Sequence, residues 1–139
     1  MKALVLAVLF VVSAFGQVVI TDTGSTNRIG MTVTVNDKGN AEVTPRRGTP
    51  VKMQIPSEMH TKLIQDVEAA GPLDQLAVRH CAKSVSFGSR MFVTYKGVQS
   101  PDISCGGQTD PSAIALQKDA EDIMTLAKTK VPDTRPQFR

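Results

Sequence analysis

Aromatic residues are scarce in this chain: it has no tryptophan, one tyrosine and five phenylalanines among 139 residues. Proteins that bind nucleic acid usually combine clustered Lys and Arg with aromatic side chains on which bases stack. Here the basic residues are scattered along the sequence. We therefore expect no nucleic-acid partner.

Metal ligands and common catalytic motifs are also scarce. Cys81 and Cys105 are the only cysteines, and His60 and His80 are the only histidines. Neither Cys-x-x-Cys spacing nor a zinc-type set of cysteines and histidines is present. There is no Gly-x-Ser-x-Gly turn and no glycine-rich phosphate loop. The sequence predicts no metal and no cofactor, and it favours a protein that is not an enzyme.

An apolar run near the N-terminus is too short to span a membrane. Residues 3–12 are apolar, Lys2 precedes them, and small residues follow at 13, 14 and 16. A membrane-spanning helix needs about 20 apolar residues, whereas this arrangement is typical of a secretory signal peptide. We expect a signal peptide over 1–16, with cleavage after Ala14 as the second choice. The mature protein is then secreted or periplasmic and not inserted in the membrane.

Removal of the signal peptide leaves 123 residues, with 15 basic against 13 acidic side chains and a net charge of about +2. This length fits one domain with one core. We expect a mobile N-terminal segment over 17–29, a single domain over 30–130 and a disordered tail over 131–139, which is rich in proline and poor in apolar residues. A monomer is favoured.

One short motif points to catalysis. Asp22-Thr23-Gly24-Ser25 follows an apolar run and resembles the active-site turn of the pepsin-like and retroviral aspartic proteases. That chemistry requires two aspartates that share a proton. Because the turn occurs once, the resemblance implies a homodimeric peptidase of the retroviral type with Asp22 as the catalytic residue. The family places a β-hairpin before its aspartate, and little precedes Asp22 in the mature chain. We favour a polar turn and keep the peptidase as the alternative.

Hydrophobic periodicity predicts an α+β domain. Apolar and polar residues alternate with period 2 in the strand-like segments and recur at helical spacing in two others. Ser57 and Asp110 are predicted helix caps, and Gly71 ends the first helix. The expected order βββαββα places two helices on one face of a mostly antiparallel sheet of about five strands. The strands are expected at 31–35, 41–44, 51–55, 84–95 (with a bulge or turn at 88–89) and 98–104. The helices are expected over 57–70 and from 111 onward, before the tail that begins at 131.

The two cysteines are expected to form one disulfide. An even cysteine count in an exported chain indicates a bridge, and Cys81 and Cys105 allow one connectivity. The bridge encloses a predicted β-hairpin in which Pro101 confines the returning strand to an edge or shortens it. Lys83, Ser100 and Asp102 are polar residues near the bridge. They form the possible recognition surface, although local hydrogen bonding within a turn is the simpler interpretation.

A broader pattern runs through Gly71-Pro72-Leu73, residues 80–88 and Ser100-Pro101-Asp102-Ile103-Ser104-Cys105. It resembles small uncharacterised exported bacterial proteins with a two-cysteine α+β domain. The resemblance implies export and the disulfide, and it supplies no activity, cofactor or catalytic residue. The function we expect is a non-enzymatic binding or interaction module. Its partner is expected to be a protein or a component of the cell envelope.

Overall fold

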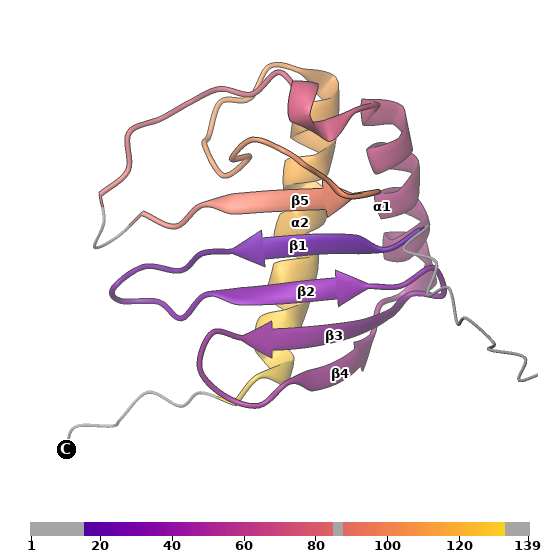
Figure 1. The fold of residues 1–139 in the computed structure, drawn as a ribbon, viewed down its shortest axis with the longest axis vertical. Helices are drawn as coiled ribbons and strands as arrows, with labels where there is room; N and C mark the ends of the chain where they lie inside the picture. The colour runs from indigo at the N-terminus through magenta and orange to yellow at the C-terminus, as the bar shows by residue number, and fades with distance from the viewer. Residues whose placement is uncertain (1–15, 85–87, 133–139) are drawn as a thin grey trace, which may run out of the picture.

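The protein is built on a six-stranded antiparallel sheet (Figure 1). The computed structural model describes residues 16–84 and 88–132. Along each long strand buried and half-exposed residues alternate, so one face of the sheet supplies the core. In the spatial order β4-β3-β2-β1-β5-β6, the strands are β1 (Val18–Asp22), β2 (Met31–Val35), β3 (Asn40–Pro45), β4 (Val51–Gln54), β5 (Met91–Tyr95) and β6 (Val98–Gln99).

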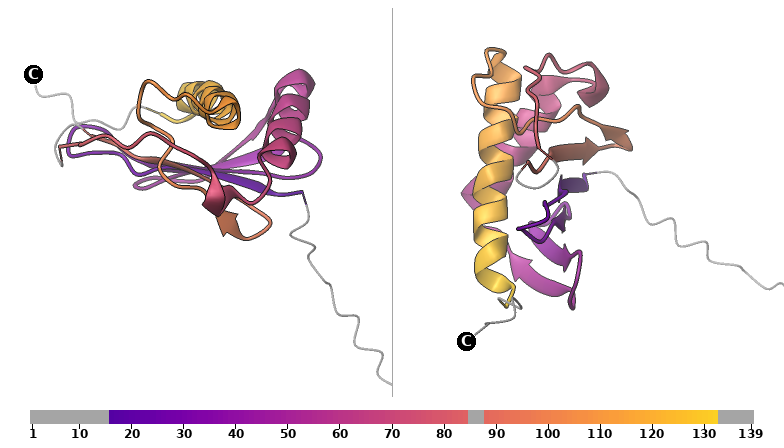
Figure 2. Two further views of the ribbon diagram at one scale, coloured as in Figure 1. Left: turned by 90° about the horizontal axis from the view of Figure 1, so that it is seen from above. Right: turned by 90° about the vertical axis from the view of Figure 1, so that its left-hand side faces the viewer.

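Two helices, α1 (Ser57–Ala70) and α2 (Pro111–Lys130), lie together on one face of this sheet (Figure 2). The short 3-10 helix η1 (Leu73–Gln75) follows α1. Apolar residues at helical spacing, such as Leu63 on α1 and Ile123 on α2, are fully buried against the sheet. The α+β class and the placement of both helices on one face are as the sequence predicts.

The helix ends follow local sequence chemistry with one exception. The side chain of Asp110 accepts a hydrogen bond from the backbone N–H of Ala113 at 3.1 Å, which confirms it as the cap of α2. Gly71 ends α1 with a φ of 68°. The prediction that Ser57 caps α1 is wrong. Ser57 is the first helical residue, and Pro56, which has no side chain able to accept a hydrogen bond, takes the cap position.

The largest difference from the sequence-based expectation is β1. Residues 17–29 were expected to precede the domain, but Val18–Asp22 forms a strand between β2 and β5. Ile20 pairs with Val33 on one side and with Val93 on the other, and all three side chains are fully buried. The prediction of a mobile segment over 17–29 is therefore wrong for these five residues, and the sheet has six strands rather than five. Pairing on both sides stabilises this short apolar run as a central strand.

Three predictions concern residues outside the described part of the chain, namely 1–15 of the signal peptide, 85–87 of the strand expected over 84–95, and 133–139 of the tail. Within the residues described, no helix has the length and apolar character needed to cross a membrane.

The returning strand expected over 98–104 ends at Gln99, two residues before Pro101. This shortening agrees with the effect expected of Pro101, which cannot donate a hydrogen bond to the sheet.

Candidate functional site

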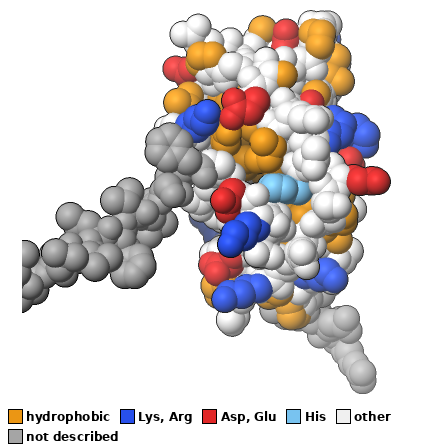
Figure 3. Space-filling view, turned by 90° about the vertical axis from the view of Figure 1, so that its right-hand side faces the viewer, with side chains coloured by type: hydrophobic (Ala, Val, Ile, Leu, Met, Phe, Trp, Pro, Cys, Tyr) orange, Lys and Arg blue, Asp and Glu red, His pale blue; other side chains and the backbone are white. Residues whose placement is uncertain are grey.

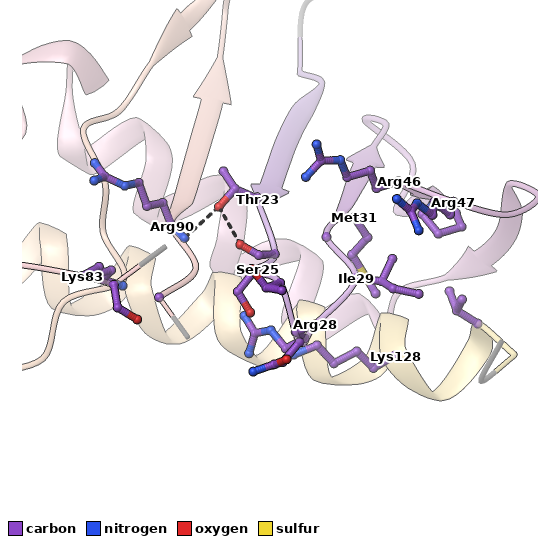
Figure 4. A pocket seen from close by; sticks show the side chains of 18 of the residues that line it. Thr23, Ser25, Arg28, Ile29, Met31, Arg46, Arg47, Lys83, Arg90 and Lys128 are labelled. Carbon is purple, nitrogen blue, oxygen red and sulfur yellow. Dashed lines mark hydrogen bonds between the residues drawn. The ribbon is translucent and has the colours of Figure 1, made fainter. Parts of the chain in front are cut away.

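Four segments that are far apart in the sequence meet at one end of the molecule. They are the turn between β1 and β2, the loop between β3 and β4, the residues that precede β5, and the C-terminal end of α2. The strand order explains the first three, since β1 and β3 end, and β5 begins, at the same end of the sheet (Figure 1). Between these segments opens a cleft of about 1240 Å³ (Figure 4).

The residues that make up this cleft are strongly biased in charge. No acidic side chain is among the described residues that line it, whereas six of the 13 Lys and Arg residues in the described part of the chain are. We call it the basic cleft. Its cationic residues are Arg28, Arg46, Arg47, Lys83, Arg90 and Lys128.

The turn between β1 and β2 forms the inner wall of the basic cleft. Asp22, at the end of β1, is 3% exposed, and its Oδ1 accepts a hydrogen bond from the backbone N–H of Gly24 at 2.9 Å. Gly24 has a φ of 68°, and a Cβ there would lie 2.3 Å from the backbone nitrogen of Gly30. Only glycine allows the two arms of the turn to approach so closely. The Asp-Thr-Gly sequence therefore forms a tight turn in which the aspartate bonds to the backbone two residues ahead.

Asp22 is also ion-paired. Nη2 of Arg28 lies 2.7 Å from Oδ2 of Asp22, and the same nitrogen donates a hydrogen bond to the hydroxyl of Ser89. No carboxylate lines the basic cleft among the described residues. Both oxygens of Asp22 are thus occupied by donors of its own turn. An aspartic peptidase would require its second carboxylate from another copy of the chain.

The segment before β5 forms the second wall. Arg90 and Thr23 exchange two hydrogen bonds, from the N–H of Thr23 to the carbonyl of Arg90 at 2.9 Å and from the N–H of Arg90 to Oγ1 of Thr23 at 3.0 Å. Earlier in this segment, the ammonium group of Lys83 donates hydrogen bonds to the carbonyl of Ser89 at 2.6 Å and to the hydroxyl of Ser104. These bonds hold both cationic residues at the edge of the cleft.

The disulfide fixes the start of the second wall. Sγ of Cys81 and Sγ of Cys105 are 2.03 Å apart, with 5.8 Å between the Cα atoms, which confirms the predicted bridge. Cys105 is 2% exposed and belongs to the buried part of the domain, whereas Cys81 is exposed. The bridge therefore ties an exposed segment, two residues before Lys83, to the core.

Five of the six cleft cations form no ion pair with the residues that the structure describes. The described residues form five ion pairs, and only that of Arg28 with Asp22 involves a residue of the basic cleft. The other end of the molecule is different: in Figure 3 acidic and basic side chains are interspersed there. Of these five cations, Lys83 donates hydrogen bonds to Ser89 and Ser104. The other four have no acidic partner among the described residues, namely Arg46, Arg47, Arg90 and Lys128.

The predicted recognition residues separate in the structure. Lys83 lines the basic cleft, but Ser100 and Asp102 do not. Ser100 is 3% exposed, and its hydroxyl accepts from the N–H of Val93 at 3.0 Å, while Oδ1 of Asp102 accepts from the N–H of Met91 at 3.0 Å. These two side chains extend the hydrogen bonding of the β5 edge beyond the end of β6. Burial raises the pKa of Asp102, but hydrogen bonds from Ser104 and from the N–H of Met91 outweigh it and hold that pKa below its usual value.

A second cluster of charged groups lies between the two helices. The ammonium group of Lys62 is 2.5 Å from Oδ2 of Asp66 on α1 and 3.2 Å from Oδ1 of Asp119 on α2. Burial, followed by the hydrogen bond with Asp66, raises the pKa of Asp119 to about 7, whereas the same hydrogen bond lowers the pKa of Asp66. Oδ2 of Asp119 is buried and has no hydrogen-bond partner among the described residues, which fits a carboxyl group whose charged form is disfavoured. This cluster joins the helices and lies away from the basic cleft.

Most of the basic cleft could not be recognised in the sequence. The adjacent pair Arg46-Arg47 is a visible signal in an exposed loop, but Arg28, Arg90 and Lys128 lie far from that pair and from one another in the sequence. No group of three or more His, Cys, Asp or Glu residues in the described part of the chain could hold a metal ion.

No family model matches the chain, and neither the curated proteins nor the solved structures contain a significant match.

Proposed function

We propose that this protein is an exported, non-enzymatic binding module, secreted or periplasmic, and that its ligand is an anion held in the basic cleft. The observation that carries the proposal is the convergence of Arg46, Arg47, Arg90 and Lys128 on one cleft without an acidic partner among the described residues. Charges of one sign around a concave surface concentrate counter-ions there and speed their association. The expected partner is a protein or a component of the cell envelope.

The kind of cation in the basic cleft supports an anionic ligand. Three of the four unpaired cations are arginines, whose planar guanidinium groups bind carboxylates and phosphates through two parallel hydrogen bonds. No His, Asp or Glu side chain lines the cleft within the described residues, so the groups most used in acid–base catalysis are not presented to a ligand there. The disulfide supports export, because such bridges persist in oxidising compartments.

The proposal can be tested with fluorescein-labelled poly-L-glutamate and fluorescence anisotropy at low salt. The variant Arg46→Gln/Arg47→Gln removes two charges from the basic cleft. The matched control Lys38→Gln/Lys52→Gln removes two charges from exposed positions outside it. We expect the cleft variant to bind about tenfold more weakly, which corresponds to about 1.4 kcal/mol. The control is expected to stay close to the wild type.

Two results would overturn the proposal. One is an equal loss of affinity in the two variants, which would show that only net charge matters. The other is no measurable binding of poly-L-glutamate by the wild type at low salt. Because all four substituted side chains are exposed, both variants are expected to fold, and their circular dichroism and thermal unfolding confirm this before binding is compared.

A further inference from the structure

The basic cleft contains an exposed apolar side chain among its cations. Ile29 is 37% exposed, and the only other exposed large apolar residue among those described is Ile114, at 47%. Ile114 lies near the N-terminal end of α2 and does not line the cleft. Met31, two residues after Ile29, is 8% exposed and also lines the cleft. The cleft therefore offers an apolar contact as well as charge.

The cations are distributed around this apolar contact. In Figure 4 the side chains of Ile29 and Met31 lie between Arg46 and Arg47 on one side and Arg28 and Lys128 on the other. Arg90 and Lys83 extend the row of cations along the wall formed by the segment before β5. A ligand that contacts all of these groups carries several negative charges, with an apolar group between them.

The size and shape of the cleft favour a flexible chain. Its volume of about 1240 Å³ exceeds the roughly 300–1,000 Å³ of ordinary small-molecule pockets. A concave surface of this size does not fit the flat surface of a bilayer. Nucleic acids are disfavoured too, because no aromatic side chain among the described lining residues is available to stack on a base. A polypeptide with acidic side chains provides both carboxylates and an intervening apolar side chain.

We infer that the ligand is an acidic segment of a partner protein, in which an apolar residue flanked by Asp and Glu packs on Ile29 while the carboxylates bind the surrounding arginines. This inference rests on the proposed binding of anions in the basic cleft and adds the chemical class of the ligand. Burial of an apolar side chain contributes a selectivity that charge alone does not give, since every polyanion satisfies the cations.

Two synthetic peptides test the inference. Both are fluorescein-labelled 11-residue peptides of alternating Asp and Glu; one has leucine at its centre and the other has serine. We expect the wild type to bind the leucine peptide about tenfold more tightly than the serine peptide, as measured by anisotropy. In Ile29→Ser this preference is expected to be lost, because the leucine no longer packs on an apolar side chain. The matched control Ile114→Ser removes the other exposed isoleucine and retains the preference.

The outcomes distinguish this inference from the proposed function. If both peptides bind equally and Arg46→Gln/Arg47→Gln weakens both, the cleft binds anions and the inference about an apolar residue is overturned. If the double arginine variant changes neither affinity, the proposed function fails as well. Tighter binding of inorganic polyphosphate, or of phosphatidylglycerol vesicles, than of the leucine peptide overturns the assignment to a protein segment. Thermal unfolding of Ile29→Ser and Ile114→Ser shows that both variants are folded.

Discussion

Nη2 of Arg28 lies 2.7 Å from Oδ2 of Asp22, whose side chain is 2% exposed. The other oxygen of this carboxylate accepts the backbone N–H of Gly24. Because Arg28 also donates to Ser89, one buried carboxylate orients a cation that connects the turn after β1 with the segment before β5. Asp22 therefore shapes two walls of the basic cleft at once.

Replacement of Asp22 is expected to destabilise the protein. Asp22→Ala leaves the N–H of Gly24 without its acceptor and Arg28 without its ion pair. We expect the free energy of unfolding in urea to fall by about 1–3 kcal/mol, the typical effect of removing one partner of a buried hydrogen bond. Asp37→Ala, at an exposed position in the turn after β2, is the control and should change it by less than about 0.5 kcal/mol. Equal effects would contradict this role of Asp22.

The peptidase alternative has its own test. Pepstatin-sensitive cleavage of a denatured protein at acidic pH, abolished by Asp22→Asn, would establish it and displace the binding module. In the structure Asp22 is bonded to Arg28 and Gly24 and has no second carboxylate beside it in the cleft among the described residues. We therefore expect no such cleavage by the wild-type protein.

Ser100 and Asp102 are expected to affect stability rather than ligand binding. Ser100→Ala leaves the buried N–H of Val93 without the hydroxyl that accepts it, and Asp102→Ala removes the acceptor for Met91. Each substitution is expected to lower the free energy of unfolding by about 1–3 kcal/mol. The affinity for poly-L-glutamate should stay near that of the wild type. A loss of affinity without a loss of stability would instead assign these residues to the recognition surface.

The sequence predicts the helices and strands of this fold better than it predicts which strands pair with one another. Alternation over 31–35 and helical spacing over 57–70 are local signals, and both elements form as expected. The run Val18–Ile20 is equally apolar, but it follows a signal-peptide pattern and its partners lie in β2 and β5. Its place at the centre of the sheet depends on pairing with a strand some 70 residues away in the sequence. The local hydrophobic periodicity of a segment does not indicate such a partner.

The basic cleft could not be predicted from local sequence signals for the same reason. Its cations are separated by long stretches of sequence and are brought together by the strand order β3-β2-β1-β5 and by the length of α2. The cysteines, by contrast, could be paired from the sequence because two cysteines allow one connectivity. Ser100 and Asp102 accept hydrogen bonds from the backbone of β5, and a sequence does not distinguish a side chain that binds a ligand from one that accepts a hydrogen bond at a strand edge.

Stability is expected to depend on pH through Asp119. Its pKa is about 7 in the folded protein, raised mainly by burial, and its usual value is 3.8. At a pH between these two pKa values, Asp119 binds more protons in the folded state than in the unfolded state. The contribution of Asp119 to stability is therefore largest below about pH 4, and it is lost as the pH rises to about 7. Asp119→Asn should flatten the decline in Tm between pH 5 and 7.5. Asp122→Asn, the exposed partner of Lys118, should retain it. An unchanged slope in Asp119→Asn would contradict the assignment.

Tyr95 can be followed directly because it is the only tyrosine in a chain without tryptophan. A hydrogen bond to Glu68 is the main cause that raises the pKa of Tyr95 to about 12. We expect the ultraviolet absorbance of the phenolate to appear well above the usual midpoint near pH 10. Glu68→Gln should lower that midpoint because the negative charge that opposes ionisation of Tyr95 is removed. A wild-type midpoint near pH 10 would show that the contact does not persist in solution.

Removal of the disulfide should weaken both the fold and the basic cleft. The bridge closes a loop between positions 24 residues apart, and the chain-entropy model gives about 3.5 kcal/mol of stabilisation for such a loop. Cys81→Ala/Cys105→Ala is therefore expected to lower the free energy of unfolding by about that amount. Binding of poly-L-glutamate should also weaken under conditions where the variant is still folded, because the exposed segment that leads to Lys83 loses its covalent link to the core. If the variant loses stability but binds as tightly as the wild type, the cleft wall is held by the hydrogen bonds of Lys83 and Arg90 alone.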